Sequence, residues 1–449
     1  NAKETIFLCG WQVDLSTVLD VENNVSLIET LERKCEQGVK VFVLTSEAPM
    51  TECAVHNIAC MKRKRHQGLH FEMPFMRDGG ASYSKRGLWK AIRWIWPRLA
   101  VHSTSCCEGL VHQRYCMFDD EIAMIGGTDV DAEMRNSYSD MLPNSKGYYW
   151  TEYGVVFRAP EEFKAFCRSN HQLRGKATIS SPLISGNFVM GNTDHERMLK
   201  VIRATESFLF LENQYIESHA STNNAVFREI AKKILAKAAS QERFQFVLFT
   251  NLTYADYCHE QNRPNKLGCS YYTYDGTYRL AKSLDFLYAQ LAEQLTQAEI
   301  KDRVFVFFPP PNLLVHAKTL ISDHQDMMYG SGNLWDRSLS QPSDIEISIK
   351  LKGPKVAEAE MKIISQYTKQ KVTPSSIVDA LESCPSIQRY DQASSAVYKL
   401  RDASMWKLSR ALFIALSFLI VCCSALGFLY RAHQQTEKRI ISGDMCLSK

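Results

Sequence analysis

One motif occurs twice, and this repetition constrains the chain more than any other feature of its sequence. Each copy places a basic residue two positions after a histidine and an aspartate seven positions after it. The copies are His112, Arg114 and Asp119, and then His316, Lys318 and Asp323. A pair of small residues follows fourteen positions after each histidine. A single His and Lys on one strand commonly arises by chance, whereas two copies at equal spacing predict an internal duplication.

The apolar pattern around the two copies repeats as well. In each half, a buried strand, an amphipathic helix and a second strand precede the motif. These expected elements are Thr5–Trp11, Val25–Gln37 and Val39–Leu44 in the first half, and Phe208–Leu211, Ala225–Ala239 and Phe244–Phe249 in the second. A helix over Leu284–Glu299 and a strand over Val304–Phe308 lead into the second motif, and Trp150–Pro160 is a further strand candidate.

Strand, helix and strand at this spacing are typical of parallel sheets covered by helices. The sequence therefore predicts an α/β fold of two duplicated lobes, residues 1–175 and 176–370, each with a mostly parallel or mixed sheet flanked by helices.

The residue types in the motif suit a phosphate. Side chains alternate between the two faces of a strand, so His316 and Lys318 are expected to point the same way. The ammonium holds anionic oxygens, while the imidazole attacks phosphorus or transfers a proton. A downstream glutamate also recurs, as Glu152 in the first half and Glu346 in the second.

The chain after about Gln370 has a different character. Residues 371–405 are polar and predict a linker, and the twenty residues from Ala411 to Tyr430 contain no charge. That length spans a bilayer, so we expect a transmembrane helix over residues 406–431, followed by a short tail over 432–449. Basic residues on the two sides of the span nearly balance and lean slightly towards a cytosolic location for the lobes.

Two cationic segments allow more than one interpretation. The pattern over Ser84–Leu99 is rich in tryptophan and predicts an amphipathic helix that either packs on a sheet or lies at a membrane interface. Lys62–Arg65 is a short basic run of the kind that is usually solvated. The net charge of +4 does not require a nucleic-acid partner, and the fourteen cysteines show no zinc spacing. Nothing in the sequence sets an oligomeric state.

The doubled pattern H-x-K-x4-D-x6-G-S-x-N resembles that of the phospholipase D superfamily, over a stretch from about Ile6 to Gly353. Two stretches, Gly330–Ser338 with Glu346 and Glu212–Tyr215, are similar to its eukaryotic phospholipid-hydrolysing branch.

The resemblance implies one active site at a pseudo-twofold interface between the lobes. In it, His112 is the nucleophile and His316 the general acid and base, with Glu152 and Glu346 orienting the imidazoles. It also implies that phosphate oxygens bind the residues Lys318, Arg114, Asn333 and Ser331. No metal or other cofactor is expected. Asp119 and Asp323 belong to the catalytic motif, where we expect them to hold its loops rather than to touch the substrate, which is the alternative role.

Two residues depart from the family pattern. Arg114 replaces the usual lysine, and Asp129 stands where the second copy has Asn333. The expected function is a membrane-anchored phosphodiesterase, held in the bilayer by residues 411–430, that hydrolyses or transphosphatidylates phospholipids through a phosphohistidine. Two alternatives stay open: a nuclease of the same superfamily acting on single-stranded nucleic acid, and a weakly active or non-catalytic lipid-binding protein because of Arg114.

Overall fold

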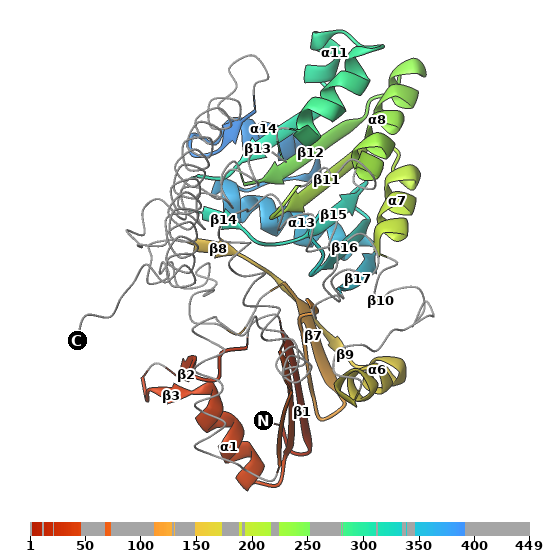
Figure 1. The fold of residues 1–449 in the computed structure, drawn as a ribbon. Coiled ribbons are helices and arrows are strands. Elements are labelled where there is room, and N and C mark those ends of the chain that lie inside the picture. Colours follow the sequence, from red (N-terminus) through yellow and green to blue (C-terminus); the bar gives the residue numbers. More distant parts are fainter. Residues whose placement is uncertain are drawn as a thin grey trace, which may run out of the picture.

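The structure is a computed structural model whose described residues form two large β-sheets and two small ones, with flanking helices (Figure 1). It describes residues 2–10, 13–20, 22–45, 68–72, 112–127, 130, 149–172, 188–190, 194–216, 224–251, 280, 282–310, 313–334, 338 and 346–390. Two sheets flanked by helices confirm the predicted α/β class.

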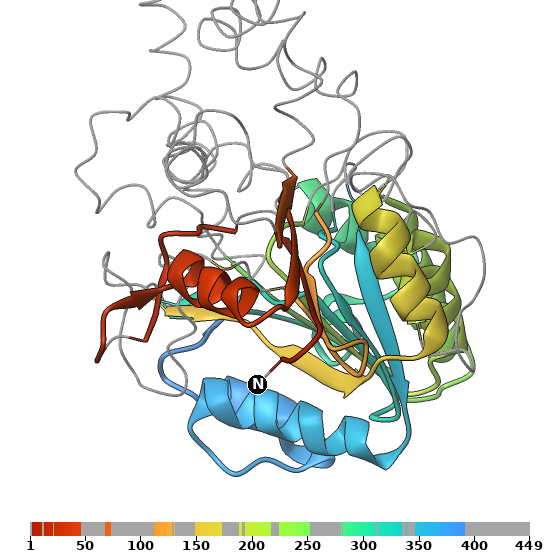
Figure 2. The same cartoon turned by 90° about the horizontal axis from the view of Figure 1, so that it is seen from below.

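The first sheet contains strands in the order β5-β4-β1-β6-β7-β9. Its strands are β1 (Thr5–Gly10), β4 (Lys40–Thr45), β5 (Leu69–Glu72), β6 (Tyr115–Phe118), β7 (Ile122–Gly126) and β9 (Gly154–Arg158). Strands β1, β4 and β5 are parallel, and β6, β7 and β9 join by antiparallel pairing, so the sheet is mixed. Helices α1 (Leu27–Glu36) and α6 (Glu161–Gln172) lie on opposite sides of these strands (Figure 2).

The second sheet has the order β10-β17-β16-β15-β11-β12-β13-β18. Its strands are β10 (Phe188–Met190), β11 (Phe208–Asn213), β12 (Gln245–Thr250), β13 (Val304–Phe308), β15 (Thr319–Ser322), β16 (Asp326–Gly330), β17 (Ile347–Lys352) and β18 (Gln388–Arg389). The helices of this half include α7 (Asp194–Ala204), α8 (Asn224–Ala239), α11 (Gln297–Lys301), α13 (Pro354–Thr368) and α14 (Ile377–Glu382), and residues 282–292 are also helical.

Two small sheets complete the described strands. Strand β14 (Leu313–Val315) of the second half pairs in parallel with β8 (Tyr149–Thr151) of the first, and β2 (Val18–Asp20) pairs with β3 (Val25–Ser26). The β14–β8 pair joins the two halves directly beside the second motif.

The strand pairing repeats around both motifs. Strand β1 pairs in parallel with β4 and antiparallel with β6, and β11 pairs in the same two ways with β12 and β15. In register, Leu8 lies opposite Cys116 in the first sheet and Leu211 opposite Leu320 in the second. The duplication seen in the sequence is therefore also present in the pairing.

The largest buried cluster is shared by the two halves. It contains Phe7 and Met117 from the first sheet, Phe210 and Ile321 from the second, and the inner faces of α6 and α13. A second cluster lies under α7 and α8 and a third under α1. Because both sheets contribute to one core, the packing of that core sets the position of one sheet relative to the other.

Several element boundaries differ from the sequence predictions; the strand expected over Trp150–Pro160, for example, is divided into β8 and β9. Two further differences arise from helix caps. The helix expected over Leu284–Glu299 ends at residue 292, and α11 then begins behind Thr296. Thr296 and Glu299 form a capping box, which starts a new helix. Ser26 and Glu29 form another, so α1 begins at Leu27 and Val25 belongs to a strand.

Another difference concerns the expected linker. Its first part, residues 371–390, folds onto the second lobe as a 3-10 turn (Pro374–Ser376), α14 and β18. Ile377 and Leu381 are buried in the shared core. The overall polar composition of this stretch did not predict these apolar contacts.

The membrane prediction concerns residues that the structure does not describe. Within the described ranges, no helix has the length and apolarity to cross a bilayer. The expected span over residues 406–431 and the tail lie outside those ranges, as do residues 391–405, Lys62–Arg65 and Ser84–Leu99.

Candidate active site

Each motif histidine lies shortly before a strand of one of the two large sheets. His112–Arg114 comes directly before β6, and His316–Lys318 connects β14 to β15. We predicted these residues within strands, whereas the ladder between β15 and β11 begins at Thr319. The preceding strand β14 belongs to a different pair, and the His316 N–H donates to the main-chain oxygen of Thr151 at 3.1 Å. The change of partner strand leaves these three residues outside the ladder.

The motif side chains are buried together with both downstream glutamates. No more than 6% of any of them is exposed: His112, Arg114, Glu152, His316, Lys318 and Glu346. Charged groups at this depth require partners, because burial of an isolated charge is very costly.

The histidines and glutamates pair across the two halves. Nδ1 of His112 lies 2.8 Å from Oε2 of Glu346 in the second half, and Nδ1 of His316 hydrogen-bonds Glu152 in the first. Each half thus supplies the histidine of one pair and the carboxylate of the other. Neither pair is complete without both halves.

Glu346 is held in its ionised form. Burial raises its pKa, but the charge of His112 and hydrogen bonds from His112, Ser331 and Ser338 together bring that pKa below the ordinary value. Ser331 Oγ donates at 2.6 Å, and Ser338 Oγ donates to the other oxygen. Ser331, which we expected at the phosphate, therefore contacts the carboxylate instead.

Glu152 has the opposite tendency. Its burial raises the pKa, and Lys318 and Arg114 only partly offset that shift. The hydroxyl of Tyr329 donates to Oε1 of Glu152 at 3.1 Å and accepts the N–H of Gly127 at 3.1 Å. The two carboxylates thus differ in their environment, as two histidines with opposite protonation states require.

Gly127 explains one of the small residues that follow the motif. A Cβ at this position would lie 2.1 Å from Oε1 of Glu152, far inside van der Waals contact. A side chain here would therefore push Glu152 away from His316.

Each basic residue folds back onto its own histidine. Nη1 of Arg114 donates to the main-chain oxygen of His112 at 3.1 Å and lies 3.1 Å from the Nε2 atom of the His112 ring. Nζ of Lys318 donates to the main-chain oxygen of His316 and to Oε1 of Gln214 at 3.0 Å. Since a carboxylate only accepts hydrogen bonds, the Nδ1 of His112 that faces Glu346 carries a proton, and when the ring is neutral its lone pair lies on Nε2.

A third buried carboxylate lies beside this site. Glu212 is fully buried and accepts hydrogen bonds from Tyr367, Thr319 and Tyr153. Burial raises its pKa to about 7; hydrogen bonds from Tyr367, Thr319 and Tyr153 work against this shift, and nearby Glu152 adds to it. Thr319 directly follows Lys318 in one half-site, and Tyr153 directly follows Glu152 in the other. Glu212 is therefore hydrogen-bonded to a residue adjacent to each half-site.

Asp119 and Asp323 perform matching structural roles at the far ends of β6 and β15. Asp323 accepts three main-chain N–H bonds, from Glu206, Ser207 and Phe208, at 2.7, 2.8 and 3.0 Å. Asp119 does the same for Lys3, Glu4 and Thr5. Both have positive φ, and their pKa is lowered because these bonds outweigh burial. They anchor the start of β1 and of β11, and the structure does not bring them to the histidines.

The remaining predicted residues are only partly placed. Asn333 is 2% exposed, and among the described residues its Oδ1 has no hydrogen-bond partner. Asp129 lies outside the described residues. No cluster of three or more potential metal ligands occurs in the described part of the chain.

Three contributors to the site were not identified from the sequence: Tyr329, Ser338 and Gln214 as the partner of Lys318. Ser338 and Gln214 lay within stretches singled out by resemblance alone. Tyr329 had no signal, because Ile125 occupies the matching position of the first half.

Comparison with known proteins supports the fold. No protein-family model matches the sequence, and no curated protein matches it. Among solved structures, the chain is similar to the phosphatidylserine synthase of Haemophilus influenzae Rd KW20, with 14% identity and a TM-score of 0.51. The match covers 94% of this chain and 90% of that one. At this identity the likeness shows a shared fold.

Proposed function

We propose that the protein is a phosphodiesterase of the phospholipase D type that acts on phospholipids. The observation that carries the proposal is the crossed arrangement of two buried histidine–glutamate pairs, His112 with Glu346 and His316 with Glu152. A basic residue accompanies each histidine. Two imidazoles, two orienting carboxylates and two cations are the groups that a two-step phosphoryl transfer through a covalent intermediate needs.

In the first step, Nε2 of His112 attacks phosphorus as the bond to the leaving alcohol breaks. His316 donates its proton to the departing alkoxide, and an N–P bond replaces the P–O bond. Arg114 and Lys318 hold the non-bridging oxygens, whose charge they stabilise. In the second step, His316 accepts a proton from water or an alcohol, whose oxygen displaces His112 and restores its lone pair.

His112 is the better candidate for the nucleophile because of Glu346. A phosphohistidine bonded through Nε2 carries a proton on Nδ1 and a positive ring, and both are stabilised by an anionic acceptor. The lowered pKa of Glu346 keeps that acceptor ionised. Arg114 Nη1 lies beside Nε2, so it must move onto the phosphate oxygens when substrate arrives.

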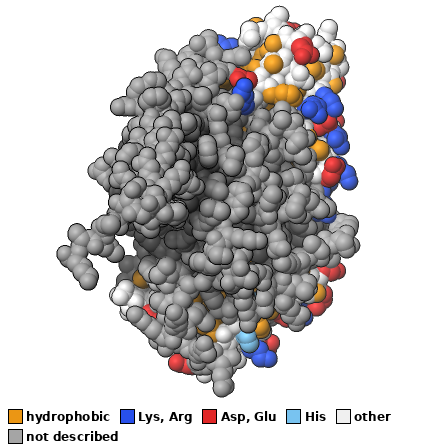
Figure 3. Space-filling model, in the orientation of Figure 1, with side chains coloured by type: hydrophobic (Ala, Val, Ile, Leu, Met, Phe, Trp, Pro, Cys, Tyr) orange, Lys and Arg blue, Asp and Glu red, His pale blue; other side chains and the backbone are white. Residues whose placement is uncertain are grey.

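Three observations favour a lipid over a nucleic acid. A solved structure that is similar in fold is named for the synthesis of a phospholipid. On the face seen in Figure 3, Lys and Arg side chains are intermixed with Asp and Glu along one edge, with no basic patch among the described residues there. Ion pairs such as Arg203–Glu229 and Lys237–Glu206 also place basic side chains of α7 and α8 beside carboxylates. The apolar segment 411–430 also supports attachment to a membrane.

The test is a lipid-class assay on the full chain in vesicles, with and without a primary alcohol. We expect release of the head group and, with the alcohol present, formation of a phosphatidylalcohol. His316→Ala should abolish both. Degradation of a single-stranded oligonucleotide with lipid untouched would instead support a nuclease, and no turnover of either substrate would support a non-catalytic protein.

A further inference from the structure

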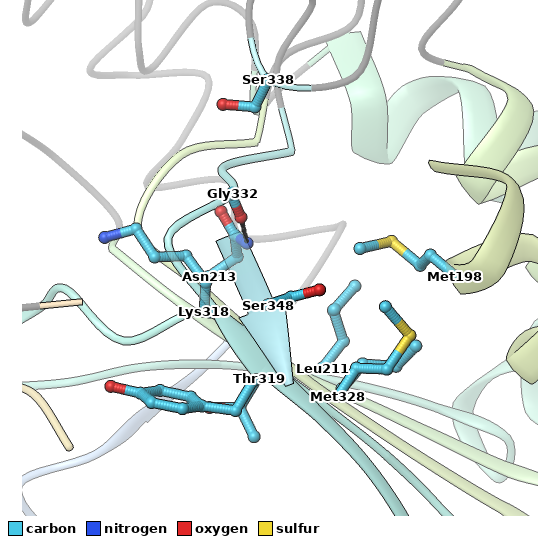
Figure 4. Close-up of a pocket in the computed structure, with 12 residues that line it drawn as sticks. Met198, Leu211, Asn213, Lys318, Thr319, Met328, Gly332, Ser338 and Ser348 are labelled. Carbon is cyan, nitrogen blue, oxygen red and sulfur yellow. Dashed lines mark hydrogen bonds between the residues drawn. The ribbon is translucent and has the colours of Figure 1, made fainter. Parts of the chain in front are cut away.

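The duplicated lobes contain two hollows at matching positions. In the second half, a hollow of about 30 Å³ lies behind Lys318 and is lined by Met198, Leu211, Leu320 and Met328 (Figure 4). Its counterpart in the first half, which we call the α1 cavity, measures about 350 Å³. The α1 cavity is lined by Ile6, Leu8, Leu31, Arg114, Cys116 and Met124, among others. The register pairs make Leu8 and Cys116 the counterparts of Leu211 and Leu320.

A helix side chain accounts for the difference in volume. In the second half, Met198 of α7 points towards Met328 and fills the space above the sheet (Figure 4). In the first half, α1 lies over the same face of the sheet but packs mainly against β4 and β5, and the described residues offer no equivalent of Met198.

The sheet face beside the α1 cavity is apolar and exposed. Phe118, Ile122 and Val156 are 36%, 47% and 66% exposed. Phe118 pairs with Ile122, and Val156 pairs with Met124, so these side chains share the face on which Cys116 and Met124 line the cavity. The α1 cavity therefore continues as an apolar surface along β6, β7 and β9.

The charged residues of the cavity lie at defined points. Of its lining residues, only Lys34 and Arg114 carry charge, and Lys34 Nζ is bonded to the main-chain oxygen of Ala2 at 3.0 Å. Arg114 is the residue that contacts His112. The cavity thus joins an apolar interior to the cation that we assign to the phosphate.

We propose that the α1 cavity binds one acyl chain of the phospholipid substrate, a role that rests on the proposed function. Its volume falls within the range of about 300–1,000 Å³ typical of ligand sites. Apolar cavities stay dry and accept apolar molecules, and each buried methylene contributes about a fourfold gain in affinity. A phosphate at Arg114 places the glycerol backbone of the same lipid at the mouth of the cavity.

The first test fills the cavity from its two walls, in the full chain. Met124→Trp enlarges a sheet residue and Thr30→Phe a residue of α1, and Val156→Trp is the matched control because Val156 shares the exposed face but does not line the cavity. The readout is the ratio of kcat/KM for dioctanoyl phosphatidylcholine to that for dibutanoyl phosphatidylcholine. We expect each filling variant to lower the ratio about tenfold and the control to leave it unchanged. Thermal unfolding checks that the variants fold.

The second test measures binding without turnover. In a His316→Ala background, lysophosphatidylcholine carrying one parinaroyl chain should show a saturable rise in fluorescence that Met124→Trp abolishes. Saturable binding that survives both filling variants would overturn the proposal, and so would an unchanged chain-length ratio. So would absence of probe binding together with a lowered melting temperature for the filling variants, because another part of the chain would then occupy the cavity. A protein that binds the probe in this cavity but hydrolyses no phospholipid refutes the proposed function separately.

Discussion

Replacement of Glu346 by glutamine tests the crossed arrangement most directly. Glutamine preserves the size of the side chain and an oxygen that accepts the Nδ1–H of His112, but it removes the negative charge. At the observed 2.8 Å, a full ion pair is worth roughly 6 kcal/mol at an effective dielectric constant of about 20. The amide dipole retains part of this interaction. We therefore expect the barrier of the step that charges His112 to rise by about 3–4 kcal/mol, or 10²–10³-fold in kcat.

The assay is steady-state release of the phospholipid head group, with thermal unfolding measured in parallel. Glu152→Gln is the matched control, because it makes the same change in the other half-site. The raised pKa of Glu152 makes its charge less stabilised to begin with, so we expect a smaller loss there. Equal losses in the two variants, or a Glu346→Gln rate within twofold of wild type, would refute the distinction between the pairs.

Three other predictions address positions around the site. Gly127→Ala should lower kcat at least 100-fold with a loss of stability of about 1–3 kcal/mol, because its Cβ would displace Glu152; a rate near wild type would contradict the close approach. Asp323→Asn should cost about 2–3 kcal/mol in unfolding free energy at pH 7 but leave kcat per folded molecule unchanged. Since the folded-state pKa of Asp323 is lowered, this stabilisation is fully present above the unfolded pKa of about 3.9 and should disappear as the pH falls through the folded value; a difference that persists in acid would refute the role of the charge. Glu212 has the reverse sign: with its pKa raised to about 7, its ionisation destabilises the fold as the pH rises from the unfolded value towards 7. The unfolding free energy of Glu212→Gln relative to wild type should therefore increase by roughly 3 kcal/mol between pH 4 and pH 8, and a pH-independent difference would exclude a titrating Glu212.

The role expected for the motif aspartates agrees with the contacts. Each accepts three main-chain N–H bonds from the start of the neighbouring strand, in both halves alike. Such a contact needs only a short acidic side chain at the end of a strand, which is why the interpretation could be reached from local turn chemistry.

The sequence by itself determined the features that depend on local pattern and on repetition. Apolar periodicity located most of the strands, although not the conformation at the two histidines, and the helix Ala225–Ala239, which the structure shows as α8 (Asn224–Ala239). Equal spacing of the two motifs established the duplication, and the residue types indicated phosphate chemistry. The sequence also identified Glu152 and Glu346 as candidate site residues, but it did not show which histidine each one contacts.

Only the tertiary structure decided which groups meet. His112 and Glu346 are 234 positions apart, and His316 and Glu152 are 164 apart, so no periodicity within an element encodes the crossing. Contacts between distant segments also explain three features that the sequence did not predict. Ser331 donates to Glu346, Tyr329 takes part in the site, and residues 371–390 fold onto the core. These contacts arise because the two large sheets pack around one core. The packing holds residues of the two sheets next to each other although they are far apart in the sequence.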